Sequence, residues 1–142
     1  MPPTFFTDRN LGKQFPAILA ENGLAVERHE DHFAHDTPDV EWIRHVARRG
    51  WIALSHDKSI RRRPNERAAV LENRLRLIVF IGKLPFPDIA RFFARTRRPV
   101  ERFIDRNDAP WIARFYVPSP AERARKRDPM GRIELWLDDR DA

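Results

Sequence analysis

The chain alternates between short apolar runs and longer segments whose apolar residues lie three or four positions apart. The runs predict β-strands, and the spaced segments predict helices. The expected strands are 4–7, 24–29, 51–55 and 75–82, and the expected helices are 11–23, 38–50 and 65–74. This β-α-β-α-β-α-β order predicts a helix-covered parallel sheet with right-handed crossovers. The strands are apolar throughout rather than at alternate positions, which agrees because parallel strands are buried on both faces.

The pattern changes after Gly82. Residues 86–108 predict a helix, or a pair of helices broken near Pro99, and two further strands are expected at 111–118 and 132–137. The charged segment between these strands contains proline and glycine, so we expect a mobile loop there.

Composition narrows the class of protein. A length of 142 residues with 42% hydrophobic content favours one domain with its own core. The chain has no cysteine, which excludes disulfide and thiolate chemistry and fits a reducing cytoplasm. No apolar run approaches the roughly 20 residues that cross a bilayer, and no signal peptide is recognisable, so we expect a soluble protein with no membrane contact.

The net charge is +6 and is carried mainly by arginine. The planar guanidinium can bind two phosphate oxygens at once, so nucleic acid is a plausible partner. An acidic protein would satisfy the same charge, and this alternative stays open at this point.

Two aspartates stand at the ends of predicted strands, Asp8 after the first and Asp57 after the third. In an open parallel sheet, ligands bind beyond the carboxyl ends of the strands, where the strand order reverses. If the second strand lies outside the first, that point falls between strands one and three. Asp39 and Glu41, in the first turn of the second helix, supply further acids. Carboxylates gathered in one crevice repel one another unless a cation such as Mg²⁺ or Mn²⁺ lies between them.

Each acid also has a purely structural interpretation. Asp8 and Asp57 could cap the turns that follow them. Asp39 lies where a helix dipole favours an acid, and Glu41 could simply face solvent.

The stretch from Phe5 to Pro64 resembles the compact PIN-like domains, among them the toxin-type ribonucleases of toxin–antitoxin pairs. The family pattern has a first strand ending in Asp, a G-x-x-V second strand, an Asp-x-x-hydrophobic helix start and a third strand ending in a D-K turn. The matching elements here are Asp8 with Asn10, "GLAVERHEDHF", Asp39 with Glu41 and Trp42, and "SHDKSI" with Asp57.

The resemblance implies a three-layer α/β/α fold with a mainly parallel sheet of four or more strands. It implies a cytoplasmic, Mg²⁺- or Mn²⁺-dependent endoribonuclease, with Asp8, Asp39 and Asp57 as catalytic metal ligands and Glu41 supporting them. It also implies RNA as substrate, a cognate antitoxin and a homodimer. We expect residues 1–84 to form the PIN-like core and residues 85–142 to form a helical and β extension packed on the same domain.

The arginines of "RRRP" directly follow the Asp57 turn. Arg61 and Arg62 are our candidates for holding the RNA backbone, and Asn10 and Lys58 for positioning substrate; a solvated turn is the alternative. Many PIN domains carry a fourth acid soon after the third-strand aspartate, and only bases stand there in this chain. A catalytically inactive PIN-like module that binds nucleic acid or protein is therefore the second hypothesis.

Two further patterns bear on zinc binding and nucleotide binding. His29, His32 and His35 have a spacing that suits zinc on one helix face, but the segment predicts the end of a strand and a loop, so surface roles are favoured. A nucleotide-binding or phosphatase-like enzyme would need a phosphate-binding glycine loop, and no G-x-x-x-x-G-K is present.

Overall fold

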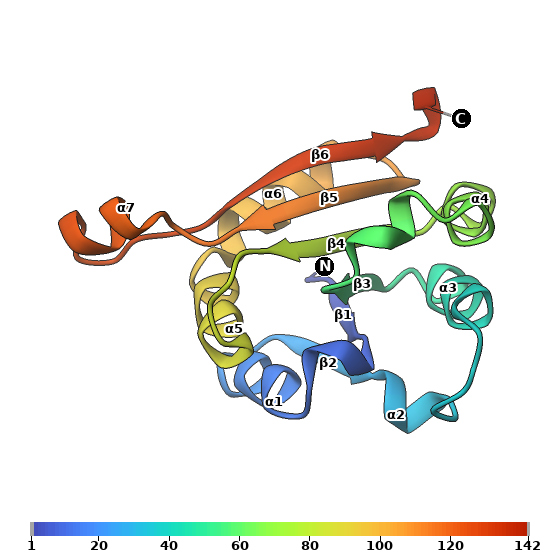
Figure 1. The fold of residues 1–142 in the computed structure, drawn as a ribbon, viewed down its shortest axis with the longest axis horizontal. Coiled ribbons are helices and arrows are strands. Elements are labelled where there is room, and N and C mark those ends of the chain that lie inside the picture. The colour runs from blue at the N-terminus through green and yellow to red at the C-terminus, as the bar shows by residue number, and fades with distance from the viewer. Residues whose placement is uncertain (1, 142) are drawn as a thin grey trace.

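The computed structural model describes residues 2–141 and contains one six-stranded sheet flanked by helices (Figure 1). The strands are β1 (Thr4–Thr7), β2 (Ala25–Arg28), β3 (Ile52–Ser55), β4 (Arg76–Ile81), β5 (Trp111–Tyr116) and β6 (Arg132–Asp138). The α-helices are α1 (Gln14–Glu21), α2 (His29–His32), α3 (Asp39–Arg48), α4 (Pro64–Asn73), α5 (Phe86–Arg95), α6 (Arg97–Arg106) and α7 (Pro120–Arg125). Short 3₁₀ turns are η1 (Arg9–Leu11), η2 (Lys58–Arg61) and η3 (Asp139–Asp141).

The strand order is β2-β1-β3-β4-β5-β6, and every neighbouring pair is parallel except β5 with β6. The mainly parallel sheet expected from the apolar pattern is therefore confirmed. The second strand lies outside the first, so the order reverses between β1 and β3. This is the place where open α/β sheets bind ligands.

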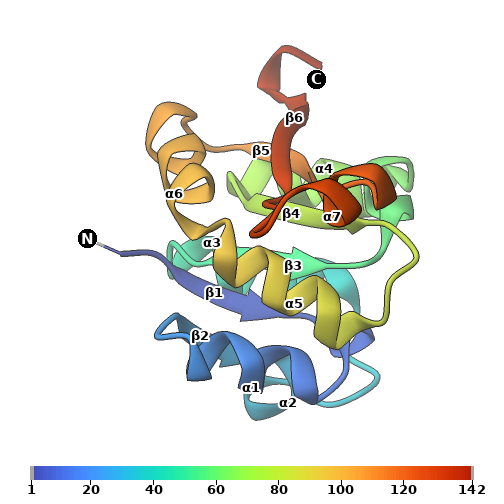
Figure 2. The same ribbon diagram turned by 90° about the vertical axis from the view of Figure 1, so that its left-hand side faces the viewer.

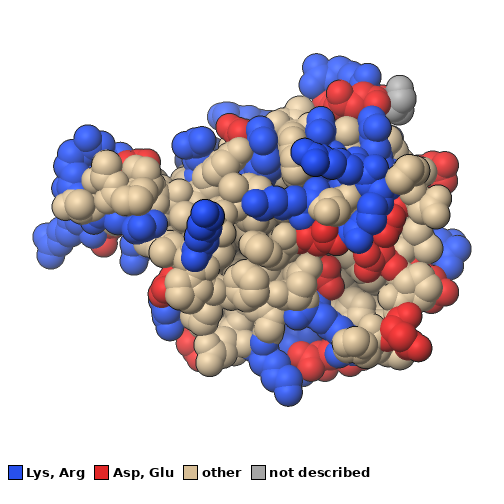
Figure 3. All heavy atoms as spheres, in the orientation of Figure 1, with Lys and Arg blue, Asp and Glu red and all other residues tan. Residues whose placement is uncertain are grey.

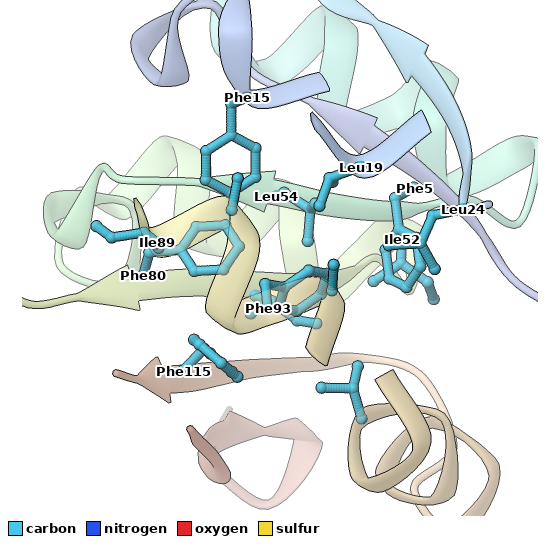
Figure 4. Close-up of a cluster of buried hydrophobic side chains, with 14 of the residues drawn as sticks. Phe5, Phe15, Leu19, Leu24, Ile52, Leu54, Phe80, Ile89, Phe93 and Phe115 are labelled. Carbon is cyan, nitrogen blue, oxygen red and sulfur yellow. The ribbon is translucent and has the colours of Figure 1, made fainter. Parts of the chain in front are cut away.

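Helices cover both faces of the sheet, which confirms the three-layer α/β/α arrangement (Figures 1 and 2). On one face, α1, α5 and α6 bury a phenylalanine-rich core that contains Phe15, Phe80 and Phe93 (Figure 4). On the other face, α3 and α4 pack against the sheet through residues such as Trp42 and Val70. Adjacent Phe5 and Phe6 are both buried, one in each core, as expected for a strand covered on both sides.

Two local expectations were wrong. The polar segment after β2 was expected to be a loop, yet α2 forms one helical turn at its start. The segment between β5 and β6 contains α7, which begins with a capping box in which Ser119 and Glu122 bond each other's backbone. The expected helix pair is confirmed: it breaks at Thr96, close to Pro99, which lies in the first turn of α6 where it costs no intrahelical hydrogen bond.

The last two strands continue the same sheet, since β5 pairs with β4 along its whole length. The division of the chain at residue 84 stays a prediction. Among residues 2–141, the helices are too short and too polar for any of them to cross a membrane.

Candidate active site

Asp8 directly follows the last residue of β1 and lies beside the end of β3. Its backbone N–H donates to the Leu54 carbonyl oxygen at 3.0 Å, which continues the β1–β3 pairing by one residue. Its carboxylate accepts from the Arg9 N–H at 2.8 Å and so caps η1. Asp8 therefore does cap the following turn, and its other carboxylate oxygen, Oδ2, points to the end of β3.

Ser55, the last residue of β3, joins the two strand ends. Its buried hydroxyl donates to Asp8 Oδ2 at 3.1 Å and accepts from the Asp57 N–H at 3.1 Å and from Asn10 Nδ2 at 3.0 Å. One donor and two lone pairs are thereby fully used. Asn10 Nδ2 also lies 3.3 Å from Asp8 Oδ2, and Asn10 Oδ1 accepts from the His56 N–H at 3.1 Å. This network fixes the Asp8 turn against the Asp57 turn.

Asp57 caps η2 by accepting from the Ser59 N–H at 2.9 Å. Its other carboxylate oxygen accepts a hydrogen bond from the guanidinium of Arg63. Arg63 lies just before α4, and its Nε is 3.4 Å from a carboxylate oxygen of Glu66 in the first turn of that helix. Asp57 is therefore both the cap of η2 and one end of an ion-pair network that continues through Arg63 to Glu66.

Asp39 opens α3, where its negative charge faces the positive end of the helix dipole. Trp42 Nε1 donates to Asp39 Oδ1 at 2.8 Å, and the Trp42 ring is fully buried. Because that ring cannot move, the hydrogen bond sets the direction of the carboxylate. Arg63 Nη2 lies 4.0 Å from Asp39 Oδ2, so one guanidinium is shared by Asp39 and Asp57.

The three aspartates influence one another electrostatically. The pKa of Asp8 is raised to about 6: burial is the largest cause, the charges of Asp39 and Asp57 add to the rise, and the hydrogen bonds from Ser55 and Arg9 oppose it. A carboxylate with a raised pKa among other acids is a frequent feature of functional sites. The structure thus brings Asp8, Asp39 and Asp57 into one neighbourhood at the reversal of strand order.

The chemistry of these donors fits a hard divalent cation. Carboxylate oxygens are the ligands of Mg²⁺ and Mn²⁺, and a cation here would offset the repulsion that raises the pKa of Asp8. As the side chains stand within residues 2–141, no three histidine, aspartate or glutamate groups converge tightly enough to hold one ion. Arg63 supplies a positive charge between Asp39 and Asp57 instead.

The remaining predicted site residues are spread around this centre. Asn10 belongs to it through its bonds to Asp8 and Ser55. Lys58 and Arg62 are exposed on η2 and at its end. Arg61 lies 5.0 Å from the Trp136 ring centroid. Glu41 is exposed and lines a depression beside α3 with arginine and histidine side chains, apart from the network of the three aspartates.

The histidines of the "HEDHFAHD" segment do not share a face toward one ion. His29 is buried beside Phe6, and its Nδ1 accepts from Arg9 Nε at 2.8 Å. Burial and the nearby Arg9 lower the pKa of His29, so its neutral form is favoured. His32 pairs with Glu27 through Nε2 at 2.8 Å. These contacts give His29 and His32 packing and surface roles.

The sequence interpretation missed Ser55 and Arg63. Ser55 stands in an apolar run two residues before Asp57, and a polar residue at that last strand position was the available signal. Arg63 was quoted in the "RRRP" turn, but its two neighbours were chosen as the functional pair.

Comparisons with known proteins identify the family. Residues 3–82 match the family described as PIN like domain. A 77-residue segment is 36% identical to a Mycobacterium tuberculosis protein named as a candidate ribonuclease, VapC45. That match covers 51% of this chain and 56% of the relative, so the chain spans little more than half of that protein's length. No solved structure matches the sequence. The family match includes β1 to β4 and all three aspartates, and the chain therefore belongs to the family of PIN-like domains.

Proposed function

We propose that this protein is a Mg²⁺- or Mn²⁺-dependent endoribonuclease and the toxin of a toxin–antitoxin pair. The observation that carries the proposal is Asp8, whose carboxyl pKa is raised to about 6 by burial and by Asp39 and Asp57 at the β1/β3 reversal. Membership of the PIN-like family and similarity to a protein named as a ribonuclease support the reaction type.

In this proposal Asp8, Asp39 and Asp57 hold the cation, and Glu41, which lies apart from them, is not a ligand. The cation, when bound, polarises the phosphodiester and lowers the pKa of a water molecule. The protein's own contribution is orientation. Ser55 fixes one oxygen of Asp8, and Trp42 fixes one oxygen of Asp39. Arg63 has to release Asp57 before that carboxylate can bind a metal ion.

Substrate contacts are assigned to groups around the three aspartates. Asn10 holds the two strand-end turns together and, with Lys58, positions the substrate. Arg61 and Arg62, at the end of η2, contact the RNA backbone. We assign these roles from position and charge: Lys58 and Arg62 are exposed, so their side chains can contact a bound substrate.

The test is cleavage of a generic single-stranded RNA with and without Mn²⁺. We expect metal-dependent cleavage that falls by about 10²-fold or more in Asp8→Asn and in Asp57→Asn, since each loses a carboxylate ligand. Asp105→Asn, an exposed acid on α6, is the matched control and should keep full activity. Cleavage that is unchanged in both site variants would dismiss the proposed metal centre.

The position of Arg63 favours one alternative, a PIN-like module that binds nucleic acid or protein without turnover. Its guanidinium already neutralises Asp57 and lies near Asp39. In that case RNA would bind, and purified protein would release no product at any Mn²⁺ concentration. The same cleavage assay therefore separates the two functions.

The antitoxin is proposed from the similarity to the VapC45 protein, and the homodimer from the family resemblance. Expression of the wild-type chain should arrest growth of a host, whereas Asp8→Asn should not. Co-expression of the adjacent gene should relieve the arrest and give a co-purifying complex. Light scattering on the isolated chain measures its oligomeric state.

A further inference from the structure

One face of the β5–β6 pair carries an alternating set of arginine and aromatic side chains. The register places Arg114 opposite Glu134 and Tyr116 opposite Arg132 on the same side, and Trp136 lies farther along β6. Helix α6 packs behind this pair (Figure 1), and Arg61 of η2 reaches Trp136 of β6. We call Arg61, Arg114, Tyr116, Arg132 and Trp136 the arginine–aromatic face.

The guanidinium groups of this face lie against the rings. Arg61 and Arg114 are each 5.0 Å from the Trp136 ring centroid. Arg114 is also 5.6 Å from the Tyr116 centroid, and Arg132 is 4.5 Å from it. A guanidinium held beside an aromatic ring keeps its N–H groups available for an anion, and either planar group can stack with a base.

The charge of this face is only partly neutralised. Glu134 pairs with Arg114 at 2.9 Å and lies 3.9 Å from Arg132. One acid among three arginines leaves two positive charges in excess. All five residues keep some solvent exposure, so a ligand can reach them.

The face is continuous with the candidate active site through η2. Asp57 caps η2 at its start, and Arg61, at its end, reaches Trp136. Figure 3 shows lysine and arginine side chains gathered over η2, β5 and β6, directly beside a group of acidic side chains. A ligand that reaches the three aspartates can therefore extend over the basic face without leaving the surface.

We propose that the arginine–aromatic face binds single-stranded RNA and leads it to the three aspartates. Arg61, Arg114 and Arg132 contact phosphates, and unpaired bases stack on the exposed planes of Tyr116, Trp136 and their arginines. This inference rests on the proposed function, and it assigns a substrate-binding surface mainly to β5 and β6, which lie beyond the family match at residues 3–82.

Single-stranded RNA fits this face better than an acidic protein does. Positive charge alone would attract an acidic protein, whereas the two large rings along the sheet are stacking surfaces for bases. Proteins that bind single strands combine a positive track with stacking surfaces, and bases remain unpaired only in single strands. The Arg61–Trp136 contact also links the face to the place where a phosphodiester would be cut.

The experiment measures binding rather than cleavage, in the full chain carrying Asp8→Asn so that the RNA stays intact. Fluorescence anisotropy with a short labelled single-stranded RNA gives the dissociation constant at several salt concentrations. The test variants are Arg132→Gln, Arg114→Gln and their combination. Arg132 is the safer of the two, because its side chain is 67% exposed. The control is Arg102→Gln, an exposed arginine on α6 with the same change of charge.

We expect the double variant to bind at least tenfold more weakly and to lower the slope of log affinity against log salt by about 1.4, at roughly 0.7 per lost phosphate contact. Arg102→Gln should change affinity by less than about twofold. Arg114→Lys should recover the charge but not the affinity, because an ammonium does not stack as a guanidinium does. Thermal melts establish that each variant is folded.

A double variant that binds RNA like the Arg102→Gln control would overturn the inference. So would a loss confined to binding of an acidic polypeptide, which would reassign the face to a protein partner. Failure of the proposed function is separate: it would show as wild-type protein that binds RNA through this face and releases no product with Mn²⁺.

Discussion

Arg63 donates to the carboxylate of Asp57 from the turn before α4, and its guanidinium lies within 4.0 Å of Asp39 as well. Two proposed metal ligands thus share a cation that belongs to the chain. The pair is only partly buried, since the Asp57 side chain is 27% exposed and that of Arg63 is 42% exposed. Ion pairs with this exposure contribute about 0.2–1 kcal/mol, so a divalent ion could displace the guanidinium at modest cost.

Replacing Arg63 by glutamine should therefore tighten metal binding. Losing this competition, about 0.2–1 kcal/mol, corresponds to an increase of about 1.4- to fivefold in Mn²⁺ affinity. Without metal the variant should melt at a lower temperature than the wild type, because Asp39, Asp57 and Asp8 would repel one another without a counter-charge. Added Mn²⁺ should raise its melting temperature more than it raises that of the wild type.

Isothermal titration calorimetry and Mn²⁺-dependent thermal shifts measure both effects. Arg62→Gln is the matched control, because Arg62 is the exposed neighbour and forms no ion pair among residues 2–141. Weaker Mn²⁺ binding in Arg63→Gln would mean that the guanidinium supports the site instead of competing for it.

Asp8→Asn should stabilise the folded protein at neutral pH. The folded pKa of Asp8, about 6, lies above its ordinary value of 3.8, so ionisation is disfavoured by folding and the wild type loses stability as pH rises from about 4 to 6. Asparagine cannot ionise and keeps an oxygen for the Arg9 N–H. The gain should reach at most about 3 kcal/mol above pH 6 and vanish below about pH 4. Urea unfolding at several pH values checks it.

Asp57→Asn provides the contrast with the Asp8 variant. It loses the ion pair with Arg63, so it should be destabilised near pH 7 by about 0.2–1 kcal/mol. If Asp8→Asn were destabilising at pH 7 to a similar degree, Asp8 would be an ordinary cap without electrostatic strain.

The position of Asp8 could be predicted from sequence because its cause is local. Phe5 and Phe6 are adjacent and both apolar, which indicates a strand buried on both faces, and an acid after such a strand has to emerge at the sheet edge. The alternation of strands and helices predicted that the strands are parallel, whereas the order β2-β1-β3 was a condition of the prediction that the structure meets. The strand and the acid that ends it depend only on residues close together in the chain.

The choice among Arg61, Arg62 and Arg63 could not be predicted in this way. The turn of η2 directs Arg61 toward Trp136, leaves Arg62 in solvent and brings Arg63 to Asp57. Trp136 comes from a strand more than seventy positions later, and the Asp39 carboxylate comes from another helix. The three consecutive arginines therefore differ in role because of their contacts in the folded chain, which their sequence does not reveal.

Ser55→Ala should uncouple the two strand-end turns. The change removes a donor from Asp8 Oδ2 and, at a fully buried position, the acceptor of the Asp57 N–H; exposed Asn10 Nδ2 keeps its contact with Asp8 Oδ2. Unsatisfied buried donors cost about 1–3 kcal/mol. Ser59→Ala, an exposed serine in η2, is the control and should change stability by less than about 0.5 kcal/mol.

A double-mutant cycle of Ser55→Ala with Asn10→Ala tests whether the network acts as a unit. Residues in one hydrogen-bond network show interaction energies of about 0.5–3 kcal/mol, so the double variant should lose less stability than the sum of the single variants. Chemical denaturation supplies the four values. Strict additivity would show that Asn10 holds its position independently of Ser55.

Gly131→Ala should distort the start of β6 and with it the arginine–aromatic face. A Cβ at this glycine would lie 2.5 Å from the Tyr116 backbone oxygen and 2.4 Å from the Phe115 ring, and backbone cannot yield cheaply. The Gly131 N–H also donates to the buried Thr96 Oγ1 at 3.0 Å. Overpacking of this kind costs about 1–3 kcal/mol. Met130→Ala, at the exposed neighbour, should be nearly neutral, and RNA affinity should fall in Gly131→Ala only. An equal melting temperature for both variants would show that this strand start adapts without strain.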